Sequence, residues 1–222
     1  MKYVRIIKKV SDFRQIESGL IVNTINGGLM EEQYFEDGVR TRLILAGISE
    51  LCEHGVRDFS LRRVALAAEV SCAAPYRHFK DKDELILEII RYIFSKWQLL
   101  CREIESAFSF NPARLVVELA AANVGFWVAN GNFRSVLMLE AGDDAADGAR
   151  EELRRFDAPI IAAISEYAMR ASLSPDSTRA LVFNVTSLIY GTVMLVITGK
   201  ERDVLSATAL LRRQVAALVV CE

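Results

Sequence analysis

The sequence predicts an all-α protein of about nine helices. Apolar residues recur at helical spacing through residues 38–222, several of these segments follow residues that commonly cap helices, and the same region has no strand-like alternation. The composition agrees, because 52% of the 222 residues are hydrophobic and only 4 are proline. Such a composition is typical of a folded helical protein and argues against disorder.

The first helix is predicted from Val39. Its apolar residues are spaced three or four apart as far as Leu51, and His54 followed by Gly55 is a usual helix end. Residues 1–37 have a weaker pattern, with a second methionine at position 30. We interpret them as an N-terminal extension that is either disordered or upstream of the true start of translation.

Two short helices and a long one are predicted next. Ser60 is the expected N-cap of the first short helix, and Ser71 is the expected N-cap of the second, which would run through His78. Asp81 and Glu84 then form a capping pattern ahead of a long amphipathic helix. The two short helices are therefore joined by a tight turn, and the long helix would connect two lobes.

The remaining helices are predicted from caps that precede prolines. Asn111 and Ser174 each stand before a proline at the first helical position. The last two helices, residues 175–198 and 203–220, are apolar on more than one face. Residues 180–199 carry no charge and are long enough to span a bilayer. Their asparagine, serine and threonine residues favour the centre of a helical bundle or a dimer interface, so we expect no membrane partner.

The charge distribution predicts where a nucleic acid could bind. The net charge is −2, so the chain as a whole does not attract DNA. Between Gly55 and Lys82, however, six basic residues stand against three acidic ones. Any binding to DNA must come from this local patch.

Neither a metal site nor a disulfide framework is predicted from the cysteines. Cys52, Cys72, Cys101 and Cys221 are scattered along the chain and are not paired with histidines at metal-ligand spacing. We expect a cytoplasmic protein without an export signal or a cofactor. The sequence also lacks the glycine-rich, phosphate-loop and zinc-protease signatures of common enzymes, so no enzyme is predicted.

Three stretches of sequence indicate the function: residues 41–46 (TRLILA), 59–65 (FSLRRVA) and 70–85 (VSCAAPYRHFKDKDEL). A helix enters the major groove of DNA only if its exposed face is slim, and Cys72 and Ala73 are small. Hydroxyl, guanidinium and amine groups at helix ends suit binding to phosphate. Each residue also has a simpler interpretation, with the aromatic rings in the core and the arginines as solvated charges.

In this order, the three stretches resemble the DNA-binding domain of the TetR family of transcriptional regulators, over about residues 40–90. The resemblance implies a three-helix helix-turn-helix domain at residues 38–84 and a larger helical domain for effector binding and dimerisation at residues 85–222. It implies a homodimer that represses transcription from double-stranded operator DNA and leaves this palindromic site when a small apolar or aromatic molecule binds. The residues assigned to DNA are Arg42, Ser60, Arg62, Ser71, Cys72, Ala73, Ala74, Tyr76, Arg77, His78 and Lys82. One departure is Glu69, which stands where the family usually has glycine and would be strained in a left-handed conformation.

Two further sets of residues are assigned to the C-terminal domain. Aromatic residues of its inner helices supply enough surface to line a ligand pocket, although an ordinary packed core explains each of them as well. This set comprises Phe94, Trp97, Phe126, Trp127, Phe133, Met138, Phe156 and Tyr167. The resemblance also implies that the last two helices form a four-helix interface with a second copy, and we assign to it Leu181, Leu188, Val193, Leu205, Leu211 and Leu218. The alternative function is a helical interaction or scaffold protein with a degenerate helix-turn-helix, which would show no salt-sensitive DNA binding.

Overall fold

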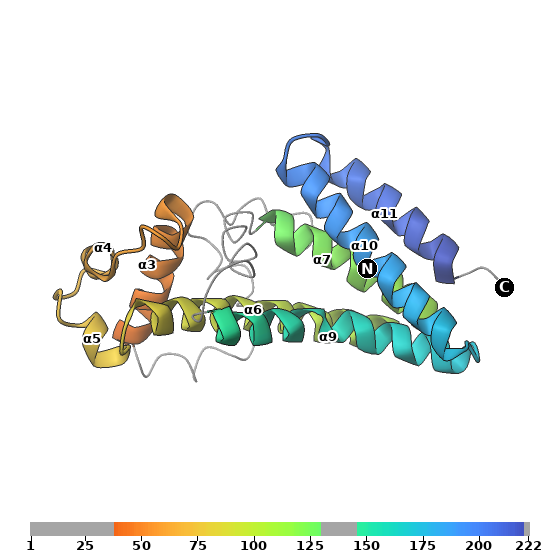
Figure 1. Ribbon diagram of the computed structural model, residues 1–222, viewed down its shortest axis with the longest axis horizontal. Coiled ribbons are helices and arrows are strands. Elements are labelled where there is room, and N and C mark those ends of the chain that lie inside the picture. The colour runs from red at the N-terminus through yellow and green to blue at the C-terminus, as the bar shows by residue number, and fades with distance from the viewer. Residues whose placement is uncertain (1–37, 130–145, 220–222) are drawn as a thin grey trace. The chain divides into compact units, whose positions relative to one another are not determined.

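The computed structural model describes residues 38–129 and 146–219, which form eight α-helices and no strand (Figure 1). This confirms the predicted all-α class; the predicted total of about nine helices refers to the whole chain. The helices are α3 (Gly38–His54), α4 (Leu61–Ala67), α5 (Pro75–His78), α6 (Lys82–Phe108), α7 (Pro112–Ala129), α9 (Ala146–Arg170), α10 (Pro175–Ile197) and α11 (Val204–Val219).

The described residues divide into two compact units. The N-terminal unit comprises residues 38–96 and 146–154, and the C-terminal unit comprises residues 97–129 and 155–219. Helices α6 and α9 therefore contribute to both units, each with one end in one and one end in the other. The predicted division into functional domains at residues 84 and 85 stays a prediction, and residues 1–37 lie outside the described part.

Close packing of α3 against the start of α6 holds the N-terminal unit together. A Cβ atom on Gly47 would lie 2.6 Å from Cδ1 of Ile89, so any larger residue here requires the end of the Ile89 side chain to move. Arg40 on α3 forms an ion pair with Glu88 on α6. Helix α3 ends as predicted, because Gly55 adopts a φ of 70° that glycine tolerates.

The C-terminal unit is built around α7. This helix is buried from Leu115 to Trp127, and α10 and α11 pack against it and against each other (Figure 1). The predicted caps are confirmed, since Asn111 Oδ1 accepts a hydrogen bond from the Arg114 amide at 3.0 Å and Ser174 Oγ accepts one from the Ser177 amide at 3.1 Å. These caps satisfy backbone donors that the first turn of each helix leaves unpaired.

Among the described helices, α7 and α10 are long and apolar enough to cross a membrane by length and composition alone. Helix α7 is mostly buried in its own unit, as expected for the central helix of a bundle. Only 22% of the most apolar window of α10 is buried within this chain. The apolar character of α10 therefore needs an explanation beyond the core of a single copy.

Candidate DNA-binding interface

Helix α4 is anchored to α3 through the buried carboxylate of Glu50. Its Oε1 accepts hydrogen bonds from the Ser60 amide at 2.9 Å and from the Arg63 guanidinium at 2.5 Å, and His54 Nδ1 lies 3.3 Å from its Oε2. Burial acts to raise the pKa of Glu50, but the hydrogen bonds from Arg63 and from the Ser60 amide outweigh it and hold the pKa below its usual value. The charge on Glu50 therefore fixes the start of α4.

The predicted N-cap of α4 is confirmed. Ser60 Oγ accepts a hydrogen bond from the Arg63 amide, and Ser60 itself has an extended backbone. Arg63 is occupied by Glu50 and by the Asp58 carbonyl. Arg62 is exposed beside it, so this arginine presents its guanidinium to solvent.

The turn after α4 is tight, as the sequence predicted. Glu69 has a φ of 57°, in the left-handed region. The Val70 amide donates to the Ala65 carbonyl at 3.0 Å and the Glu69 amide donates to the Leu66 carbonyl at 3.1 Å, which together form a Schellman motif. Glutamate thus occupies the position at which this motif usually has glycine, and the turn is tight despite the departure.

The expected cap of the second short helix is wrong. Ser71 does not cap a helix: the Ala74 amide donates to the Ser71 carbonyl at 2.9 Å in a turn. Helix α5 begins only at Pro75, without a side-chain cap. The proline explains this start, because its fixed φ suits the first helical position and it needs no hydrogen-bond partner for a backbone N–H.

Side chains of α5 and the preceding turn divide sharply between core and solvent. Pro75 and Phe79 are buried, whereas Tyr76 is 64% exposed and Arg77 is exposed. Phe79 lies against His78 and under the Arg40 guanidinium, 5.4 Å from its ring centroid. The core interpretation therefore holds for Phe79, while Tyr76 and Arg77 are available to a partner.

All eleven residues assigned to DNA lie in the N-terminal unit, and none is buried. Eight are exposed: Arg42, Arg62, Ser71, Cys72, Ala73, Tyr76, Arg77 and Lys82. Ser60, Ala74 and His78 are half-buried. Sequence reasoning missed Glu50 and the Arg40–Glu88 pair, because nothing in the local pattern shows that a helical glutamate turns inward to meet a residue far along the chain.

Four of the aromatic residues assigned to a ligand pocket form one buried cluster. Trp97, Phe126, Trp127 and Phe156 come from α6, α7 and α9, with ring centroids 4.6 Å apart for Trp127 and Phe156 and 4.8 Å apart for Trp97 and Phe156. Direct ring contact is what a packed core would show, and it does not test the ligand assignment.

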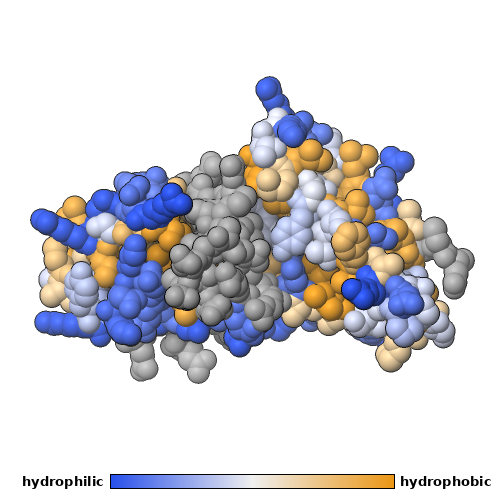
Figure 2. Space-filling model, in the orientation of Figure 1, coloured by the Kyte–Doolittle hydropathy of each residue, from blue (hydrophilic) through white to orange (hydrophobic). Residues whose placement is uncertain are grey.

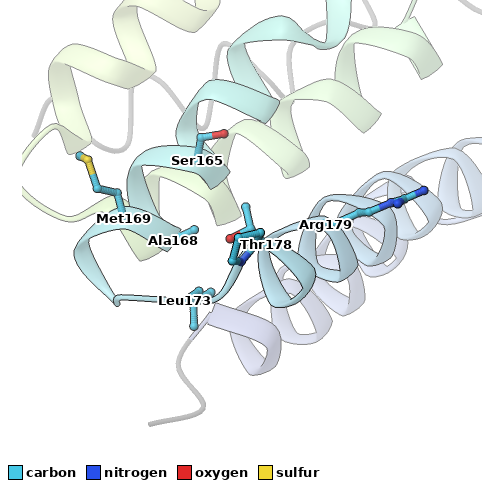
Figure 3. A pocket seen from close by; sticks show the side chains of 7 residues that line it. Ser165, Ala168, Met169, Leu173, Thr178 and Arg179 are labelled. Atoms are coloured by element: carbon cyan, nitrogen blue, oxygen red, sulfur yellow. The ribbon is translucent and has the colours of Figure 1, made fainter.

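The other members of the pocket set are not in this cluster. Phe94 is buried in the N-terminal unit, and Tyr167 is half-buried further along α9. Phe133 and Met138 lie outside the described residues. An open pocket of about 480 Å³ lies where α9 meets α10, and none of the predicted aromatic residues lines it (Figure 3).

The residues assigned to a dimer interface need correction. Leu181, Val193 and Leu211 are buried within the chain's own C-terminal unit, so they are not available to a second copy. Leu188 and Leu218 are half-buried, and Leu205 is 62% exposed. The exposed apolar side chains of the last two helices are instead Phe183, Tyr190, Met194, Leu195, Leu205 and Leu210, and Figure 2 shows hydrophobic surface over α10 and α11.

Comparison with known proteins gives one match to the DNA-binding segment and several to the fold of the chain. Residues 43–89 match the family model described as bacterial regulatory proteins, tetR family. A comparison with the sequences of curated proteins gives no match. Solved structures with the same fold include three regulators, each with a TM-score of 0.65.

The first is the transcriptional regulator FadR from Bacillus subtilis in complex with stearoyl-CoA, with 14% sequence identity over 82% of this chain and 97% of that one. The second is the fatty acid degradation regulator FadR from Bacillus halodurans, with 16% identity over 82% and 97%. The third is a TetR transcription regulator from Haloarcula marismortui, with 15% identity over 82% and 96%. At these identities the likeness is one of fold.

Proposed function

We take as a premise that residues 43–89 are a tetR-family DNA-binding domain, within a chain that has the fold of such regulators, and we propose that this protein is a ligand-responsive repressor. Two copies bind a palindromic operator through α4 and α5. A small apolar or aromatic molecule binds in the C-terminal unit and lowers operator affinity.

The observation that supports DNA binding best is the exposed band on α5 and the turn before it. Cys72 and Ala73 are small and exposed, so the backbone can approach base edges closely. Tyr76 and Arg77 project from the same segment and supply hydrogen-bond donors. The buried Pro75 and Phe79 hold the segment against the rest of the unit.

Contacts to phosphate fit the cations around this band. Arg62 on α4 and Lys82 at the start of α6 are both exposed. Arg42 is exposed as well, with its Nε donating to the Gly38 carbonyl at 3.3 Å. Contacts of this kind set the register on DNA and make affinity depend steeply on salt.

The exposed apolar face of α10 and α11 supports a homodimer. Phe183 is 71% exposed and Leu205 is 62% exposed, and a stable interface of standard size buries about 800 Å² on each partner. We define this dimer face by Phe183, Tyr190, Met194, Leu195, Leu205 and Leu210. A closed two-fold interface would pair two DNA-binding units on a palindromic site.

The dimer is tested by light scattering after size exclusion, at several concentrations. Phe183→Glu and Leu205→Glu place a charge in the dimer face and should yield monomers. Met169 is 74% exposed at the end of α9, so Met169→Glu is the matched control and should remain dimeric. A wild-type chain that stays monomeric would contradict the dimer, and one that requires detergent would favour a membrane contact for α10.

DNA binding is tested by fluorescence anisotropy with DNA from the region beside the gene of this protein. Tyr76→Ala and Arg77→Ala should each weaken binding about 10- to 100-fold, because a base or phosphate contact is worth about 1–3 kcal/mol. Arg170→Ala, on the C-terminal unit, removes an exposed cation that pairs with Glu166 and should leave affinity unchanged. The wild type should also lose affinity steeply as salt rises.

The second candidate function, a helical interaction protein with a degenerate helix-turn-helix, is favoured by the charge and conformation of Glu69. Its acidic side chain is exposed in the turn before the proposed DNA-contacting segment. Only weak, sequence-independent binding in the anisotropy experiment would support this second candidate.

A further inference from the structure

Three polar atoms near the C-terminal end of α7 are buried without a hydrogen-bond partner among the described residues. They are Nδ2 and Oδ1 of Asn123 and Nε1 of Trp127. Asn123 is 1% exposed and Trp127 is 4% exposed. Buried polar side chains nearly always have partners, so unpaired atoms of this kind call for an explanation.

The two residues lie on one face of the helix. Their spacing of four residues places them one turn apart on the same side of α7. The Trp127 ring also belongs to the aromatic cluster, 4.6 Å from Phe156 and 6.2 Å from Phe126 between ring centroids. The unpaired atoms therefore border an apolar, aromatic surface.

A second tryptophan in the same cluster provides an internal comparison. The Trp97 indole N–H donates to the Phe156 carbonyl at 2.9 Å. That carbonyl belongs to α9 and lies three residues before Pro159. The cluster thus satisfies the indole N–H of Trp97, while that of Trp127 has no acceptor among the described residues.

Along α7, which is described in full, no ionisable side chain lies on the face of Asn123 and Trp127. Glu118 is the nearest ionisable residue along α7 and is held by Arg114 at 2.6 Å and Arg212 at 3.2 Å. Its position five residues before Asn123 directs it to a different side of the helix. An ionised ligand group beside Asn123 would therefore gain no counter-charge from α7.

We propose that Asn123 and Trp127 are the hydrogen-bonding anchors of the effector site, and that they select a neutral carboxamide on an apolar body. This inference rests on the proposed ligand response. The two donors, Trp127 Nε1–H and the Asn123 amide NH₂, match the two lone pairs of one carbonyl oxygen. Asn123 Oδ1 accepts from the N–H of the same amide, which a carboxylate or an ester lacks.

The test uses the full chain and four named probes: octanamide, octanoate, 2-naphthamide and 2-naphthoate. Binding is measured by calorimetric titration and by quenching of tryptophan fluorescence. At least one amide should bind at least tenfold more tightly than its matched carboxylate. Asn123→Leu and Trp127→Phe should each reduce that preference at least tenfold, because each removes the selecting atoms and leaves an apolar side chain in their place.

The melting temperature of the ligand-free chain separates an anchor from a structural group. Asn123→Leu should melt no lower than the wild type, because leucine has the branched shape of asparagine and the removed polar atoms have no partner to lose among the described residues. Trp127→Phe and Trp97→Phe both lose buried ring volume, so these two variants are compared with each other. Trp97→Phe also removes a satisfied N–H and should therefore melt about 2–4 °C below Trp127→Phe. It should leave the preference for the amide intact.

Three results would overturn the inference: no binding of either amide at millimolar concentration, equal affinity for amide and carboxylate, or unchanged selectivity in both variants. A melting temperature of Asn123→Leu as low as that of Trp97→Phe would also overturn it, because it would show a structural role for the amide. Operator binding without any probe is measured in parallel. Absence of operator binding would contradict the proposed DNA function, while the amide selectivity is tested independently by the titrations.

Discussion

Replacing Glu69 with glycine should stabilise this protein and strengthen its binding to DNA. Glu69 has a φ of 57° in the Schellman motif that ends α4. A residue with a Cβ is destabilised by about 1–2 kcal/mol in the left-handed region, and glycine relieves this strain. Glycine also has more freedom in the unfolded chain, which offsets about 0.5–1 kcal/mol of the relief. The net gain is about 0.5–1 kcal/mol, or roughly 1–4 °C in Tm for a chain of this length.

The second effect of Glu69→Gly is electrostatic. In the proposed binding mode Glu69 adds an exposed negative charge beside the phosphate backbone. Two unit charges about 10 Å apart in water repel by roughly 0.4 kcal/mol before salt screens them. Affinity for operator should rise about two- to threefold. The gain should shrink as salt rises, because mobile ions already screen the interaction.

Two control variants separate strain from charge. Glu69→Gln removes the charge but keeps the Cβ, so it should tighten DNA binding without raising Tm. Ser172→Gly relieves a similar φ of 54° in the C-terminal unit, in the matching motif that ends α9. It should raise Tm by a similar amount without changing DNA affinity.

The assays are thermal unfolding followed by circular dichroism and operator binding followed by fluorescence anisotropy. A Glu69→Gly variant that melts at or below the wild-type temperature would refute the argument from backbone strain. Unchanged affinity in both Glu69 variants at low salt would refute the placement of this turn near DNA.

Three further predictions concern the packing, the buried ion pair and the thiols. Gly47→Ala should lower the free energy of unfolding by up to about 2 kcal/mol. Its Cβ would meet the end of the fully buried Ile89 side chain at 2.6 Å, which costs about 1–3 kcal/mol, while the higher helix propensity of alanine returns about 1 kcal/mol; denaturant unfolding measures this. Glu50→Gln should lower that free energy by about 1–2 kcal/mol at neutral pH. The folded-state pKa of Glu50 lies below 4.5. The difference in unfolding free energy between the variant and the wild type should therefore shrink as the pH falls below 4.5 and vanish below the folded-state pKa. Thiol labelling followed by mass spectrometry should modify exposed Cys72 in the native protein and spare Cys101, whose pKa is raised by burial.

Each of these predictions has a clear contrary result. Gly38→Ala is the control for Gly47, because a Cβ there meets nothing within 4 Å, and equal effects of the two substitutions would contradict the packing argument. A stability difference for Glu50→Gln that persists in acid would show that charge is not its cause. Labelling of Cys101 as fast as Cys72 would show that the surrounding helices open readily.

Local chemistry explains why many features could be predicted from the sequence. The caps at Ser60, Asn111 and Ser174 are confirmed because a cap needs only its own side chain and an amide three residues later. Pro75 shows the limit of this reasoning. Its restricted backbone moves the start of α5 past the expected serine cap, a competition between two local signals that the sequence did not rank.

Tertiary packing determined which side chains are buried and which stay exposed, and no local sequence pattern could predict this. Helix α10 is apolar on several sides, so its sequence could not show that Leu181 and Val193 would turn inward while Phe183 stayed exposed. Glu50 and Asn123 look like ordinary helical polar residues in the sequence, yet both are buried. The sequence by itself determined the helices, their caps and the segment that resembles a DNA-binding domain. Only the packing of distant helices determined which apolar face remained for a partner and which polar atoms were enclosed, because burial depends on neighbours far along the chain.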